Sequence, residues 1–216
     1  MGVREWVRSL YELVYPQPAL CPLCGIRVIP DGLPICVDCV NKINPAVYQL
    51  RLLRYQGYAL SYYHDYLKQL LYEIKYQNRY DYAVALGEVL GAAAKEQPGL
   101  EKIDYFLPVP LHQERLKKRG FNQAEAFTVG MNRVWPHPVY KAIRHKPTEP
   151  QSELSPKERL ENLRDAFALT EPALVKGKRF LIIDDIFTTG ATFYSLADLI
   201  NRYHGIPIGL FIAKSG

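Results

Sequence analysis

The chain has 216 residues, of which 48% are hydrophobic and 23% are charged. This length suffices for one full hydrophobic core with a small appendage, and the charged fraction is that of an ordinary globular protein. The formal net charge of +5 permits a polyanionic partner without requiring one. No apolar run approaches the ~18 residues of a transmembrane helix, so we expect no insertion into a membrane.

The first 15 residues have the spacing of an amphipathic helix. Charged residues alternate with an apolar side that is formed by Trp6, Val7, Leu10, Leu13 and Val14. The segment lacks the unbroken apolar core and the small-residue cleavage site of a signal peptide. We therefore predict a cytoplasmic protein.

Residues 16–45 contain all four cysteines and are rich in proline. Such a stretch cannot build a large apolar core and needs a cross-link, such as disulfides or a bound metal ion, to be stable. The spacing is Cys21-x2-Cys24, eleven residues, then Cys36-x2-Cys39. Two residues between cysteines let both thiolates face one ion, and two such pairs complete the tetrahedral four-sulfur shell that favours zinc. Because no coordination position stays open, the predicted Zn²⁺ site is structural.

Disulfides and free thiols are the alternatives to a metal site. A cytoplasmic location disfavours disulfides. One four-ligand metal site would also use all four cysteines of the chain. A zinc knuckle that docks nucleic acid or a partner protein is a further functional interpretation. The change in composition predicts two domains, with the N-terminal helix and zinc module in residues 1–48 and the rest of the chain in residues 49–216.

After the cysteines, the chain alternates between strand-like and helix-like segments. Strands are expected at 58–63, 103–109, 139–143, 166–169, 179–183 and 206–213. Helices are expected at 66–76, 82–95, 122–134, 159–164 and 192–203. Residues 145–158 are polar and proline-rich, which predicts a long loop. This alternation predicts an α/β fold with a parallel sheet that helices flank on both faces.

Between residues 179 and 203 an apolar strand runs into two acids, a small-residue loop and a helix. A helix N-terminus presents free backbone N–H groups and the positive end of a dipole, which together bind anions. Threonine hydroxyls add donors, a glycine lets the backbone approach a phosphate, and carboxylates at a strand end suit sugar hydroxyls. The alternative is a threonine-capped helix after two solvated acids. The candidate ligands are Asp184, Asp185, Thr188, Thr189, Gly190, Ala191 and Thr192.

A second strand end, at Pro108-Val109-Pro110, is followed by a loop with four cations within five residues. Cations placed this way can neutralise a pyrophosphate or the backbone of a nucleic acid. A solvated basic surface is the alternative for any one of them. Asn122 and Gln123 then begin the next helix and offer neutral donors. The candidate pyrophosphate or polyanion ligands are Arg115, Lys117, Lys118 and Arg119.

Taken together, these segments resemble the ComF family. The matching motifs are CPLCG and CVDC, Ile74-Lys75-Tyr76, PVPLH with RLKKRGFNQAE, T-x-x-Q with L-S-x-x-x-R-x-x-N-L-R-x-A-F, and DDIFTTGAT. They occur in this order over nearly the whole chain. DDIFTTGAT is also similar to the signature with which type I phosphoribosyltransferases bind phosphoribosyl pyrophosphate (PRPP). Gln77-Asn78 departs from the family pattern, which often has a small residue or glycine there.

The resemblance implies a type I phosphoribosyltransferase-like domain with an N-terminal zinc finger. It implies that Asp184 and Asp185 hold the ribose hydroxyls and are the catalytic acids of any reaction, while the 188–192 loop holds the 5′-phosphate. Mg²⁺ would bridge the ribose and the pyrophosphate, and the 145–158 loop would be a lid that excludes water.

The biological role that the resemblance implies is DNA uptake in natural transformation. Partners would then be PRPP or a related ribose phosphate, together with single-stranded DNA or a helicase of the ComFA type. The alternative is an active phosphoribosyltransferase of nucleotide metabolism with an unidentified acceptor.

Overall fold

The computed structural model describes residues 20–30, 33–145 and 166–215. The helices expected at 1–15 and 159–164, and the loop expected at 145–158 apart from its first residue, lie outside the described residues. Among those that are described, no helix is both long enough and apolar enough to cross a membrane.

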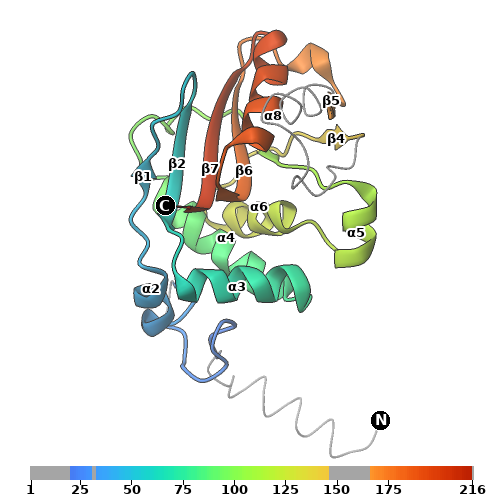
Figure 1. Cartoon of the computed structure of the whole chain (residues 1–216). Coiled ribbons are helices and arrows are strands. Elements are labelled where there is room, and N and C mark those ends of the chain that lie inside the picture. The colour runs from blue at the N-terminus through green and yellow to red at the C-terminus, as the bar shows by residue number, and fades with distance from the viewer. Residues whose placement is uncertain (1–19, 31–32, 146–165, 216) are drawn as a thin grey trace, which may run out of the picture.

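A five-stranded sheet forms the centre of the described structure (Figure 1). Its strand order is β1-β2-β7-β6-β3, with β1 antiparallel to β2 and every other neighbouring pair parallel. The carboxyl ends of four strands therefore meet at one edge of the sheet. The strands are β1 (Tyr48–Gln49), β2 (Gln56–Tyr62), β3 (Tyr105–Pro108), β6 (Arg179–Phe187) and β7 (Ile206–Lys214).

Helices cover both faces of this sheet, and the expected α/β fold with a parallel sheet is confirmed (Figure 1). One face carries α3 (Asp65–Tyr76), α4 (Tyr80–Ala94) and α6 (Gln123–Val134), and the other face carries α8 (Ala191–Arg202). A separate two-stranded antiparallel sheet consists of β4 (Ala142–Arg144) and β5 (Phe167–Leu169). Shorter elements are α2 (Val37–Ile43), α5 (Gln113–Arg119) and a 3₁₀ turn at Pro172–Leu174.

The central strand β6 divides two apolar clusters. Leu181 and Ile183 pack with α3, α4 and α6, whereas Phe180 and Ile182 pack with α8. All four side chains are fully buried. Because successive side chains of a strand point to opposite faces, a strand covered on both faces must be apolar throughout. This is why an unbroken apolar run was recognisable in the sequence.

Two expectations need correction. The strand expected to end at residue 183 continues to Phe187, because its pairing with β7 extends that far, so both acids lie inside a strand. The basic stretch at 115–119 was expected to be a loop and is most of the helix α5. Three cations in its last turn favour a helix because they face the negative end of the helix dipole, and Gly120 ends it with a φ of 85°.

The cysteine-containing segment packs on the same apolar cluster as the helices of the main sheet. Ile35 and Ile43 are fully buried there together with Leu67 and Ile74 of α3. The segment is thus attached to the α3 side of the molecule. A domain boundary near residue 48 stays a prediction.

Two glycines set the close approach of α4 and α6. A Cβ atom at Gly130 would lie 2.0 Å from the Val84 carbonyl oxygen, and one at Gly87 would lie 2.1 Å from the Phe127 carbonyl oxygen. Because backbone atoms cannot move aside alone, we expect Gly130→Ala to lower the free energy of unfolding by about 1–3 kcal/mol. Urea denaturation measures this, with Val129→Ala on the exposed side of α6 as the control. Equal stabilities of the two variants would contradict the close packing.

Candidate functional site

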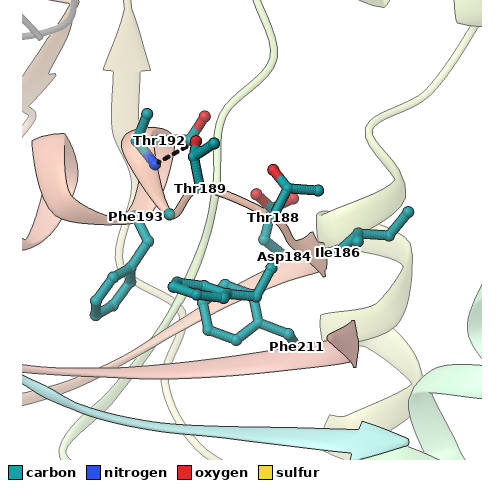
Figure 2. Close-up of a pocket in the computed structure, with 10 residues that line it drawn as sticks. Asp184, Ile186, Thr188, Thr189, Thr192, Phe193 and Phe211 are labelled. Carbon is teal, nitrogen blue, oxygen red and sulfur yellow. Dashed lines mark hydrogen bonds between the residues drawn. The ribbon is translucent and has the colours of Figure 1, made fainter. Parts of the chain in front are cut away.

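A pocket of about 90 Å³ opens where β6 ends and α8 begins. This volume is several times the ~10–15 Å³ that one water needs, so a phosphate group has room. Figure 2 shows threonine side chains on one side of the pocket and the rings of Phe193 and Phe211 on the other. The lining residues are Asp184, Ile186, Phe187, Thr188, Thr189, Gly190, Ala191, Thr192, Phe193 and Phe211.

The loop at the mouth of this pocket needs a glycine. Gly190 is the N-cap residue of α8 with a φ of 74°, a conformation that favours glycine. A Cβ atom there would lie 2.6 Å from the Phe187 ring and 2.7 Å from the Tyr194 ring. Gly190 has no side chain that could cap the helix, and the N-terminus of α8, with the positive end of its dipole, borders the pocket. The hydroxyl of Thr189 accepts a hydrogen bond from the Ala191 N–H at 3.4 Å.

The two acids point to opposite sides of the sheet edge. Asp184 lines the pocket between β6 and α8, on the α8 side of the sheet. Asp185 is buried on the α3 and α6 side, where Lys75 Nζ lies 2.6 Å from its Oδ2. The amide of Gln123 donates to the same oxygen at 3.2 Å, and the Ile186 N–H donates to Oδ1 at 2.7 Å. The sequence places these acids side by side, but the structure gives them different surroundings.

The surroundings of Asp184 raise the pKa of its carboxyl group. Burial, together with the negative charge of Asp185, raises the pKa of Asp184 to about 7. A hydrogen bond from the Asp185 N–H, 2.9 Å from Asp184 Oδ1, acts in the opposite direction. A bound cation would favour the ionised form. Asp184 is therefore a group that can accept or release a proton near neutral pH.

A larger cavity of about 470 Å³ lies between the end of α3 and helix α5. We call it the α3–α5 cavity, and its lining residues are Lys75, Tyr76, Asn78, Arg115, Lys118 and Arg119. Three of the four cations expected at an anion site are thus brought together, whereas Lys117 is not a lining residue. Arg119 donates to the side-chain oxygen of Gln123, and the amide nitrogen of Gln123 donates to Asp185. Burial lowers the pKa of Arg119.

Two further cations near the acids were missing from the sequence-based candidates. Lys75 lies in the last turn of α3 and pairs with Asp185, and Arg144 lies buried on β4 with its guanidinium 5.4 Å from the Phe167 ring. Burial lowers the pKa of Arg144, and Asp184 opposes this shift. Lys75 falls within a motif of the family resemblance, so a signal existed. Arg144 lies in the basic stretch 141–146, a candidate for binding nucleic acid, but that pattern does not indicate burial close to Asp184.

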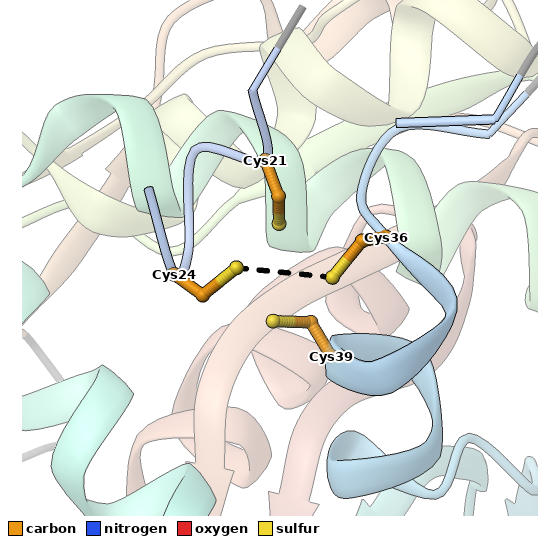
Figure 3. Close-up of side chains that lie close together, drawn as sticks. All are labelled: Cys21, Cys24, Cys36 and Cys39. Atoms are coloured by element: carbon orange, nitrogen blue, oxygen red, sulfur yellow. Dashed lines mark hydrogen bonds between the residues drawn. The ribbon is translucent and has the colours of Figure 1, made fainter. Parts of the chain in front are cut away.

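The four cysteine sulfurs converge on one point (Figure 3). All four Sγ atoms lie within 4.8 Å of one another, and those of Cys24 and Cys36 are 3.8 Å apart. Tetrahedral Zn–S bonds of ~2.3 Å would place two sulfurs about 3.8 Å apart. The Tyr66 hydroxyl donates to Cys39 Sγ at 3.3 Å and so supplies an outer hydrogen bond. This cluster can hold a metal such as zinc, as the spacing predicts.

The chain is similar to known proteins over most of its length. It is 34% identical over 189 residues to the DNA utilization protein YhgH of Escherichia coli K12, which spans 85% of this chain and 78% of that protein. It is 30% identical over 180 residues to competence protein ComFC of Bacillus subtilis, spanning 82% and 70% respectively. Adenine phosphoribosyltransferase from Saccharomyces cerevisiae is a similar solved structure, with a TM-score of 0.42 and 13% identity over 82% of this chain and 88% of that one. No protein-family model matches.

Proposed function

The chain belongs to the ComF family, and from this premise we propose that it acts in DNA uptake or DNA utilization and binds PRPP with Mg²⁺. The observation that best supports PRPP binding is the pocket that Asp184 and the 188–192 loop line together at the N-terminus of α8. The names of its relatives, a DNA utilization protein and a competence protein, support the biological role.

The donors around the pocket fit the parts of PRPP. Backbone N–H groups of α8 and the hydroxyls of Thr188, Thr189 and Thr192 would hold the 5′-phosphate. The Asp184 carboxylate would accept hydrogen bonds from a ribose hydroxyl. Mg²⁺ prefers oxygen ligands, which carboxylate, ribose and pyrophosphate supply together. The cysteine cluster would hold a structural Zn²⁺ on the far side of α3 from this pocket.

Isothermal titration calorimetry with PRPP and Mg²⁺ tests the ribose-phosphate site. We expect one site per chain, and we expect Gly190→Ala to weaken PRPP binding at least tenfold because its Cβ would collide with the rings of Phe187 and Tyr194. Gly177→Ala is the matched control, since Gly177 also has a positive φ, of 73°, but faces open space. No heat from the wild-type protein, or equal losses in the two variants, would count against the proposal.

An active phosphoribosyltransferase is the second candidate, and the raised pKa of Asp184 favours it. A general base works best when its pKa lies near the working pH. In that reaction the bond from C1 to pyrophosphate breaks, the acceptor forms the new bond to C1, and its proton passes to the Asp184 carboxylate. Release of pyrophosphate from PRPP on addition of each common nucleobase would support it. Binding of PRPP without release of pyrophosphate would contradict a transferase activity and would support the binding role alone.

For the partner we infer single-stranded DNA, or a helicase of the ComFA type. The net charge of +5 and the cations of the α3–α5 cavity support a polyanionic ligand. Binding to single-stranded DNA should fall steeply with salt, because each neutralised phosphate releases counterions. No binding at low salt, and none to such a helicase, would remove this part of the proposal.

A further inference from the structure

We propose that single-stranded nucleic acid binds in the α3–α5 cavity, with the ring of Tyr76 as a stacking platform for a base. This inference rests on the nucleic-acid role proposed above and gives it a place in the fold. Three observations carry it, namely the charge of the cavity, the exposed rings beside it and its link to Asp185.

The cavity gathers positive charge, and none of the described residues that line it is an acid. Lys75, Arg115, Lys118 and Arg119 supply four cations, and the remaining lining residues are Tyr76 and Asn78. Cations in a concave site focus the electrostatic field and attract phosphates more strongly than the same cations on a flat surface. A volume of about 470 Å³ is that of a site for a nucleotide-sized group.

Exposed tyrosine rings continue from the cavity along α3. Tyr76 is 64% exposed and Tyr72 is 55% exposed, and their ring centroids lie 4.9 Å apart on successive turns of the helix. Tyr80 is also exposed and packs against the edge of Phe121. Aromatic faces beside phosphate-binding cations are what single-stranded nucleic acids require, because their bases are free to stack. A duplex would bury its bases and leave these rings unused.

The α3–α5 cavity is separate from the phosphate pocket but connected to it. The two share no lining residue. Lys75 lines the cavity while its Nζ pairs at 2.6 Å with Asp185, whose neighbour in β6, Asp184, lines the pocket. A nucleic-acid phosphate in the cavity would compete with Asp185 for Lys75. Occupancy of either site should therefore change the affinity of the other, by the same factor in both directions.

Fluorescence anisotropy with a labelled oligo-dT of about 20 nucleotides, longer than the ~4–16 nucleotides of a typical site, tests the location. We expect Lys118→Glu to weaken binding at least tenfold and to flatten the salt dependence between ~50 and ~200 mM. We expect Tyr76→Ala to weaken it about fivefold or more. The matched controls are Lys68→Glu, exposed on α3 away from the cavity, and Tyr203→Ala, exposed after α8. Both should stay within about twofold of wild type.

Calorimetry with PRPP and Mg²⁺ on the same variants separates this inference from the proposed ribose-phosphate site. Gly190→Ala should lose PRPP binding and keep oligonucleotide binding, whereas Tyr76→Ala should weaken oligonucleotide binding and keep PRPP binding. Equal weakening by Lys118→Glu and Lys68→Glu would overturn the location, and no oligonucleotide binding by wild type would overturn the inference. If Lys118→Glu instead loses PRPP and PRPP displaces the oligonucleotide, the cavity is a pyrophosphate site and the inference is also overturned.

Discussion

Asp184→Asn is expected to raise the melting temperature of the ligand-free protein, whereas Asp185→Asn is expected to lower it. The two residues are neighbours in β6 but face opposite sides of the sheet. Burial raises the pKa of Asp184 to about 7 from an ordinary value of 3.8, so its ionised form is unfavourable in the folded protein. Asparagine removes that charge and keeps the oxygen that accepts from the Asp185 N–H.

The pH dependence follows from the direction of this shift. A carboxyl whose pKa is raised on folding contributes most stability when it is protonated in both states, below about pH 4. That contribution is lost as the pH rises towards 7. Wild type and Asp184→Asn should therefore melt together near pH 4, and the variant should be more stable at pH 8. We expect on the order of 2 kcal/mol there, because partial solvent exposure reduces the full effect of the shift.

Asp185→Asn should have the opposite effect because it leaves a partly buried cation without its partner. The side chains of Lys75 and Asp185 are only 20% and 12% exposed. Removing one member of such an ion pair leaves the other desolvated, and we expect a loss of about 1–3 kcal/mol. Asp198→Asn on α8 is the control. It also removes an acid, but one that Tyr55 and Arg54 contact at the surface.

Thermal unfolding at pH 4 and pH 8, followed by PRPP titration, measures both effects. Asp184→Asn should bind PRPP at least tenfold more weakly although it is more stable, because the pocket then lacks its carboxylate. Such a trade of stability for binding is common where a charge is buried for function. A variant that is no more stable at pH 8, or that still binds PRPP as wild type does, would refute the role of Asp184.

The long elements could be predicted from the sequence because their patterns repeat over many residues. The buried strands β6 and β7 are continuous apolar runs, and α3 and α6 have helical spacing. Elements of two to seven residues, such as β1 and α2, offer too few positions for a period to be seen. Helix α5 was predicted as a loop because six of its seven residues are polar and none is buried. Amphipathic patterning gives no signal in a helix without a buried face.

The candidate site was predictable in its residues but not in its connections. DDIFTTGAT pointed to the loop around Gly190, which lines a pocket, and the cysteine spacing predicted the four cysteines that converge. The separate surroundings of Asp184 and Asp185 depend on how far β6 extends, which pairing with β7 decides. The contact between Lys75 and Asp185 joins residues 110 positions apart in the sequence. Only the folded chain brings such residues together.

Removal of the metal is expected to unfold the cysteine-containing segment and to loosen α3. The sulfurs of Cys21, Cys36 and Cys39 are buried in the same apolar cluster as Leu67 and Ile74. Metal binding energy is folding energy in such a site. We expect a chelator to lower the melting temperature by about 10 °C, since ~3 kcal/mol lost from a domain of this size shifts it by about 2–4 °C per kcal/mol. Proteolysis should then cut between residues 20 and 43.

Metal analysis and melting of two variants separate loss of the ion from ordinary loss of packing. Cys39→Ser should retain less than half an equivalent of zinc and melt like the chelated protein. Ile35→Val, equally buried beside the cluster, should keep about one equivalent and lose only ~0.5–1.5 kcal/mol. Wild type that contains little zinc and melts unchanged in chelator would exclude a structural metal.

The pKa values of the thiols indicate how a metal ion would bind to this segment. Burial raises the pKa of Cys39 to about 12 and raises that of Cys36, so thiolates are unfavourable there without a positive charge. Backbone N–H groups of residues 26 and 27 lower the pKa of Cys24 to about 6 instead. Metal binding would therefore displace protons from Cys36 and Cys39, and metal affinity should fall as the pH is lowered. An affinity that does not change with pH would mean that the buried cysteines are not ligands.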